Sequence, residues 1–250
     1  MSTQRLSIRR QGNGNPIILL HGWGMNSAIF DSLGAELSKT REVVCVDLPG
    51  YGASGWDGSL SFAVQAGMIA QEIPRGEILG WSMGGLYALE MVRQQPDQFS
   101  RIFLASFNPC FVQRRDWSCA VKSEVFDEFA RNLENGWDGT VSRFLALQMH
   151  GVENARVLIR ETMSRLKTFG EPDPQALEFG LRLMKQQDMR TLLGNIGIPV
   201  KMILGGLDAL VPVQLAEEII QVNPRIEVES LASAAHAPFL SHKIPFLSVL

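Results

Sequence analysis

The feature that most constrains the fold is the alternation of short β-rich runs with helical patterns along most of the chain. Such alternation is typical of βαβ units, in which parallel strands form a sheet and helices cover its faces. The pattern predicts strands at residues 16–20, 42–46, 77–79, 101–105, 200–204 and 226–231. It predicts helices at about residues 28–37, 62–72, 83–94 and 213–221. Residues 6–10, followed by a Gly/Asn-rich turn, are expected to form an edge hairpin.

The alternation stops between Phe111 and about Gln187, where the chain reads as successive helices broken at residues 170–174. One helix face is expected to carry Val141, Phe144, Leu145 and Met149. A helical block inserted between two strands is most simply a lid over the carboxyl edge of the sheet. We therefore expect a single α/β unit with its core at residues 1–111 and 188–250 and a helical lid at 112–187.

Composition narrows the classes of function. The 250 residues are 46% hydrophobic, enough for one large core, and the net charge of -3 gives no global reason to bind nucleic acid or an anionic membrane. No signal peptide or apolar run of membrane-spanning length is evident, so a cytoplasmic location without a membrane partner is expected. The protein is also expected to be a monomer. Cys45, Cys110 and Cys119 have no metal-ligand spacing, and no metal or other cofactor is expected. Cys45 and Cys110 are expected to be buried, unreactive thiols.

The segment Gly80-Trp81-Ser82-Met83-Gly84 lies between a predicted strand and a predicted helix. It fits G-x-S-x-G, a strained turn that exposes a nucleophilic serine. Glycines flank the serine because the tight turn leaves no room for a Cβ. The motif alone is weak evidence, but its place between a strand and a helix strengthens it.

A serine nucleophile needs a base and an acid, which must come from elsewhere in the chain. His236 follows the last predicted strand, and Asp208 lies in a loop after the strand before it. The order Ser82, Asp208, His236 is the one expected for a nucleophile on such a turn. Asp208 could instead cap the helix starting near Pro212, and His236 taken alone fits a core or loop histidine.

Hydrolysis of an acyl bond also requires donors for the oxyanion. The backbone N–H groups of Met83, after the serine, and of Trp23, in the loop after the first parallel strand, are predicted to supply them. His21 is expected to anchor that loop by hydrogen bonds. The Trp23 and Trp81 side chains either form a wall for the acyl group or belong to the core.

A dinucleotide site is the rival interpretation, since Gly22-Trp23-Gly24 follows a strand and Asp47 ends the next one. Ser27 stands where the third glycine of that fingerprint would be, and this reading leaves the serine, the acid and the histidine unexplained. Asp47 is better interpreted as an acid that stabilises turns through hydrogen bonds to nearby backbone.

Together these motifs resemble the α/β-hydrolase superfamily. More narrowly, the chain resembles the family of pimeloyl-[acyl-carrier-protein] methyl ester esterases of biotin synthesis, in segments 20–26, 79–86, 109–111, 143–148 and 234–239. The likeness covers nearly the whole chain, including the predicted lid. It implies a serine carboxylesterase that releases methanol and the free carboxylate from the carrier-bound ester.

The resemblance also implies contacts. The acyl chain would lie against Trp23, Trp81, Phe144, Leu145, Leu147 and Gln148. Acyl carrier protein would be gripped by Arg143, Arg156 and Arg160, the last two sharing one helix face, although all three also fit a solvated surface. A general short-chain carboxylesterase or thioesterase acting on free acyl esters shares every catalytic residue and stays open as an alternative. A non-catalytic binder built on the same fold is a further alternative.

Overall fold

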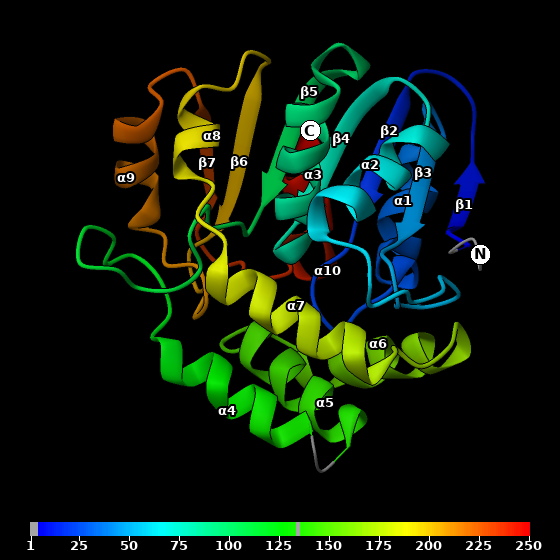
Figure 1. The fold of residues 1–250 in the computed structure, drawn as a ribbon, viewed down its shortest axis with the longest axis vertical. Helices are drawn as coiled ribbons and strands as arrows, with labels where there is room; N and C mark the ends of the chain where they lie inside the picture. Colours follow the sequence, from blue (N-terminus) through cyan, green and yellow to red (C-terminus); the bar gives the residue numbers. More distant parts are fainter. Residues whose placement is uncertain (1–4, 134–135) are drawn as a thin grey trace.

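The computed structural model describes residues 5–133 and 136–250, which form a seven-stranded sheet in the order β1-β3-β2-β4-β5-β6-β7 (Figure 1). Every neighbouring pair is parallel except β1 with β3. The strands are β1 Ser7–Gln11, β2 Pro16–Leu20, β3 Glu42–Asp47, β4 Gly76–Trp81, β5 Phe99–Ala105, β6 Val200–Gly205 and β7 Glu227–Leu231. The six parallel strands agree with the predicted ones to within two residues at each end.

The first strand corrects one prediction. β1 pairs antiparallel with β3, from Ser7 opposite Asp47 to Gln11 opposite Val43, and does not form a hairpin with β2. The turn after β1 therefore carries the chain over β3 to the inner strand β2. A Gly/Asn turn reverses the chain direction, but it does not decide which strand becomes the neighbour.

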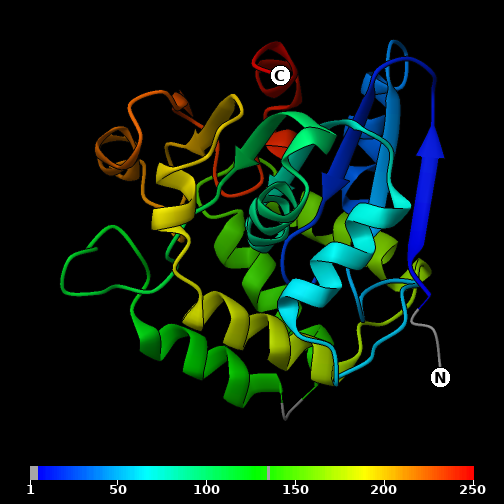
Figure 2. The ribbon, with the colours of Figure 1, turned by 45° about the horizontal axis from the view of Figure 1, so that its top comes forward.

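Helices cover both faces of the sheet (Figures 1 and 2). One face carries α2 Phe62–Glu72, α3 Met83–Gln94 and α8 Arg190–Gly194, and the other carries α1 Asp31–Leu37 and α10 Pro238–Ser241. The remaining short elements are η1 Ser27–Phe30, η2 Pro96–Gln98, α9 Leu215–Val222 and α11 Lys243–Ser248. The predicted helix at 28–37 is split, because residues 27–30 form a 3-10 turn before α1 begins.

Four further helices lie together beyond the ends of the parallel strands (Figure 1). They are α4 Ser123–Leu133, α5 Trp137–Gln148, α6 Ala155–Thr168 and α7 Pro174–Gln186. The predicted face of α5 is buried: Val141, Phe144, Leu145 and Met149 are each at most 4% exposed. The predicted break falls between α6 and α7, where Asp173 caps α7 by accepting from the backbone N–H groups of Gln175 and Ala176.

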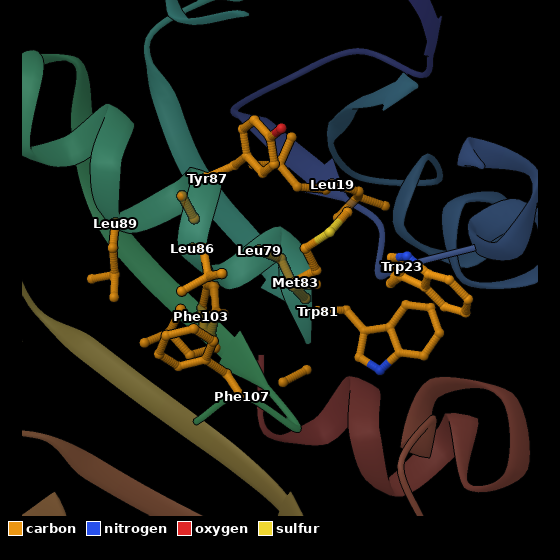
Figure 3. Packing of buried hydrophobic residues seen from close by; sticks show 14 of the residues in the cluster. Leu19, Trp23, Leu79, Trp81, Met83, Leu86, Tyr87, Leu89, Phe103 and Phe107 are labelled. Atoms are coloured by element: carbon orange, nitrogen blue, oxygen red, sulfur yellow. The ribbon is translucent and has the colours of Figure 1, made fainter. Parts of the chain in front are cut away.

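The centre of the core lies where β4 turns into α3 (Figure 3). Residues 83–92 of α3 are all buried, because this helix packs between the sheet and α2. Leu79 and Phe103 from the sheet pack with Leu86 and Phe107 there. Cys45 and Cys110 are buried as predicted, and burial raises the pKa of the Cys45 thiol to about 12. Within the described ranges, no helix combines the length and apolarity needed to cross a membrane.

Candidate active site

Ser82 occupies a strained turn between β4 and α3. Its backbone has φ 53° and ψ -122°, a region that residues other than glycine rarely adopt and that is held only when the surroundings impose it. The surroundings are tight. A Cβ on Gly80 would lie 2.6 Å from the Cα of Gly85, and one on Gly84 would lie 2.3 Å from the Leu20 carbonyl oxygen. The two flanking glycines are therefore required by the close approach of β2, β4 and α3.

The structure brings the three predicted side chains together. Ser82 Oγ lies 2.9 Å from His236 Nε2, and His236 Nδ1 lies 2.8 Å from Asp208 Oδ2. Ser82 and Asp208 are almost fully buried, and His236 has no exposed surface. These distances are those of a nucleophile, a base and an orienting acid in hydrogen-bond contact.

Asp208 serves two sets of partners with its two oxygens. Oδ1 accepts from the backbone N–H groups of Leu210 and Val211, at 2.8 and 2.9 Å, while Oδ2 faces His236. Asp208 does not cap the following helix, since α9 begins at Leu215 and its N-cap position is Gln214; its second oxygen instead binds the backbone of its own loop. With Nδ1 of His236 donating to this carboxylate, Nε2 has a lone pair free to accept the Ser82 hydroxyl proton.

The loop after β2 approaches Ser82 closely. A Cβ on Gly22 would lie 3.2 Å from the Ser82 Cβ, so a glycine here allows the loop to lie against the serine. His21 anchors the loop from behind: Nε2 accepts from the Leu48 N–H at 2.9 Å, and Nδ1 donates to the Gly22 carbonyl at 2.8 Å. This pattern requires a neutral imidazole. Burial lowers the pKa of His21 to about 4, which keeps the ring neutral.

Asp47 fixes the same region from the end of β3. It is 1% exposed, and its two oxygens accept from the Ser27 N–H at 2.7 Å and the Ala53 N–H at 3.1 Å. Both oxygens thus bind backbone, as predicted for a turn-stabilising acid. A ribose-binding role, which the dinucleotide interpretation required, finds no support in these contacts.

Comparison with known proteins agrees with this geometry. The family model described as alpha/beta hydrolase fold matches residues 15–243. The chain belongs to this hydrolase family. Curated relatives include the pimeloyl-[acyl-carrier protein] methyl ester esterases of Salmonella paratyphi A and Salmonella enteritidis, each 36% identical over 96% of this chain and 94% of its own length.

Solved structures share the hydrolase fold at lower identity. An esterase from Exiguobacterium antarcticum has a TM-score of 0.89 at 20% identity, covering 98% of this chain and 94% of its own. A bromoperoxidase from Bacillus anthracis has a TM-score of 0.87 at 18% identity, covering 98% and 93%. At such identities the likeness concerns the fold alone.

A small apolar cavity of about 20 Å³ lies next to Ser82 and His236 in this hydrolase. Its wall comes mainly from α4, α5 and α7, through Val125, Phe126, Phe129, Phe144 and Met184. A volume of this size holds about one water molecule. An acyl chain therefore needs these side chains to move before it can enter.

Of the six predicted acyl contacts, Phe144 alone lines this cavity within the described part of the chain. Trp23 stacks edge-on against Phe144 with ring centroids 5.0 Å apart, and Leu145 is fully buried beside it in the core. Leu147 is partly buried against the core. Gln148 is fully buried, with no hydrogen-bond partner for either side-chain amide atom. The roles of these residues toward substrate stay predictions.

The two tryptophans hold the site together through their indole N–H groups. Trp81 donates to the His236 carbonyl at 2.7 Å, and Trp23 donates to the Leu177 carbonyl at 2.8 Å. The Gln148 carbonyl accepts from the His236 N–H at 3.1 Å, which ties the end of α5 to the histidine loop. Sequence reasoning missed these positioning contacts, because each joins segments far apart in the chain.

The predicted carrier-contact arginines lie on α5 and α6. Arg156 and Arg160 are exposed on α6, and Arg143 is exposed on α5, where its Nε donates to the Gly139 carbonyl at 3.2 Å. Sequence reasoning did not single out Phe126 and Phe129 on α4, although both line the cavity. Their helical spacing of three residues was the available signal.

Proposed function

We propose that this hydrolase is a serine carboxylesterase that cleaves the methyl ester of pimeloyl-[acyl-carrier protein]. The observation that carries the proposal is the 36% identity to esterases of that name over 96% of the chain, which includes the lid helices. Lid segments shape the pocket in this fold, so likeness that extends through them supports a shared substrate class. The hydrogen-bonded Ser82, His236 and Asp208 supply the chemistry.

The proposed reaction uses these three side chains and two backbone N–H groups. His236 Nε2 takes the Ser82 proton as Oγ attacks the ester carbonyl, and Asp208 holds the imidazole and balances its charge. The Trp23 and Met83 N–H groups donate to the oxyanion. Methanol leaves with the proton from His236. Water, deprotonated by the same histidine, then attacks the acyl-enzyme and releases the carboxylate and Ser82.

The lid supplies recognition in this proposal. Residues 112–187 cover the serine, the acyl chain lies among the aromatic side chains beneath α4 and α5, and Arg143, Arg156 and Arg160 contact the acidic carrier protein in the cytoplasm. All three are exposed, and none forms an ion pair with a carboxylate of residues 5–133 and 136–250, which fits this role.

The test compares kcat/KM for the carrier-bound methyl ester with that for dimethyl pimelate, with Ser82→Ala as the blank. A preference of about 100-fold, roughly 2.7 kcal/mol of transition-state binding, is expected for the carrier-bound ester. Equal values would favour the general carboxylesterase. No labelling of Ser82 by a fluorophosphonate would instead favour a non-catalytic binder.

A further inference from the structure

A groove of about 790 Å³ runs between α4 and α7 on the outside of the lid. The two helices lie side by side in both views (Figures 1 and 2). Apolar side chains such as Phe126 and Leu181 form part of its wall, and charged side chains form the rest. The groove is far larger than the cavity at Ser82.

Phe126 belongs to the walls of both the groove and the cavity. It comes from α4, is only 7% exposed, and its ring therefore separates the outer groove from the space beside Ser82 and His236. The groove and the cavity beside Ser82 are thus adjacent, with Phe126 between them.

The two helices that form the groove are held differently. α7 is fastened to the core, because its Leu177 and Ala176 carbonyls accept from Trp23 Nε1 and Tyr51 Oη, at 2.8 and 3.2 Å. α4 meets α7 through a salt bridge between Asp127 and Lys185, at 2.5 Å, whose side chains are 44% and 38% exposed. An ion pair so open to solvent is worth at most about 1 kcal/mol. Separation of α4 from α7 therefore costs little in ion pairing, and Phe126 moves with α4.

The groove is positively charged overall. Its lining has four cationic side chains, Arg114, Arg131, Arg182 and Lys185, and two acidic ones, Asp127 and Glu178. Lys185 is paired with Asp127, and Arg182 has a loose contact of 3.8 Å with Glu178. Arg131 is exposed and forms no ion pair with any of residues 5–133 and 136–250. Arginine at such a site matches the geometry of a phosphate.

We propose that this groove binds the phosphate-bearing pantetheine arm on which acyl carriers hold their acyl chains, and that the acyl chain reaches Ser82 past Phe126. The inference rests on the proposed function and deepens it. With the methyl ester at Ser82, the pimeloyl chain is too long for the cavity of about 20 Å³, and in this proposal the thioester lies in the groove. Arg131 and Arg182 then face the phosphate, and the exposed arginines of α5 and α6 are left to contact the carrier protein.

The test isolates the arm from the carrier protein. We would measure kcat/KM for the methyl pimeloyl thioester of 4′-phosphopantetheine and for dimethyl pimelate, and take the ratio. The charge-reversed variant Arg131→Glu/Arg182→Glu alters the groove. The matched variant Arg165→Glu/Lys167→Glu introduces the same change of charge on α6, and in each pair one residue has a loose, exposed ion pair.

The groove variant is expected to lower the ratio by about tenfold, equivalent to about 1.4 kcal/mol, while the α6 variant leaves it within about twofold of wild type. Equal effects of the two variants, or none, would overturn the inference. A wild-type enzyme that prefers the carrier-bound ester but cleaves the phosphopantetheine ester no faster than dimethyl pimelate would overturn it too, and the proposed function would stand. A wild-type enzyme without preference for the carrier-bound ester would instead remove the proposed function and the inference together.

Discussion

His21 should make the stability of this protein fall in mild acid. Its ring is fully buried, accepts from the Leu48 N–H and donates to the Gly22 carbonyl, so the folded state needs the neutral form. Burial lowers its pKa from 6.5 to about 4. Between these values the unfolded chain binds a proton that the folded chain does not, so lowering the pH favours unfolding. The contribution of the neutral ring is intact above pH 6.5 and is lost as the pH falls toward 4.

The magnitude follows from the shift. A pH of 5 is about 1.5 units below the pKa of the unfolded imidazole, which is therefore mostly protonated, whereas the folded imidazole is mostly neutral. At about 1.4 kcal/mol per unit, the free energy of unfolding falls by about 2 kcal/mol between pH 7.5 and pH 5 through this group. Other titrating groups also contribute, so the comparison needs a variant without the imidazole.

The assay is urea unfolding of the wild type and of His21→Gln at several pH values between 7.5 and 5. The variant is expected to be less stable at pH 7.5, because the Leu48 N–H and the Gly22 carbonyl lose their buried partner. The difference in free energy of unfolding between the two proteins should narrow by about 2 kcal/mol at pH 5, because only the wild type has the buried imidazole whose protonation favours unfolding. Parallel curves for the two proteins, with a gap constant to within about 0.5 kcal/mol, would refute the account of His21.

Three further predictions concern the site. Asp208→Asn keeps the loop but loses the carboxylate beside His236, so kcat should fall by about 10⁴-fold, and a fall below tenfold would contradict its orienting role. Gly180→Ala places a Cβ 2.7 Å from both the Trp23 Cδ1 and the Tyr51 hydroxyl, which should cost about 1–3 kcal/mol in thermal unfolding, whereas Gly139→Ala, with its nearest neighbour at 3.9 Å, should cost nothing. Trp81→Phe removes the donor to the buried His236 carbonyl and should destabilise the protein by about 1–3 kcal/mol; an unchanged melting temperature would argue against that bond.

The sequence predicted what local pattern and chain order determine. The strands, the turn at Ser82 and its partners Asp208 and His236 could be named, because the glycine spacing and the places after late strands are local signals. The pairing of β1 with β3 could not, since a turn does not choose a neighbour. The cavity wall from α4 was also missed, because the position of Phe126 depends on how the lid helices pack.

The hydrogen bonds that attach α7 to the core use its main-chain atoms, in addition to the packing of its buried side chains. The core grips this helix through the carbonyls of Leu177 and Ala176, and the Asp173 N–H donates to the Gly50 carbonyl at 2.8 Å. Main-chain groups are common to all residue types, so most outward-facing side chains of α7 can be substituted without weakening its attachment to the core. Laboratory exchange of segments between relatives can therefore vary the outward side chains of α7, provided that the small residue at Gly180 and the helical course of α7 are kept.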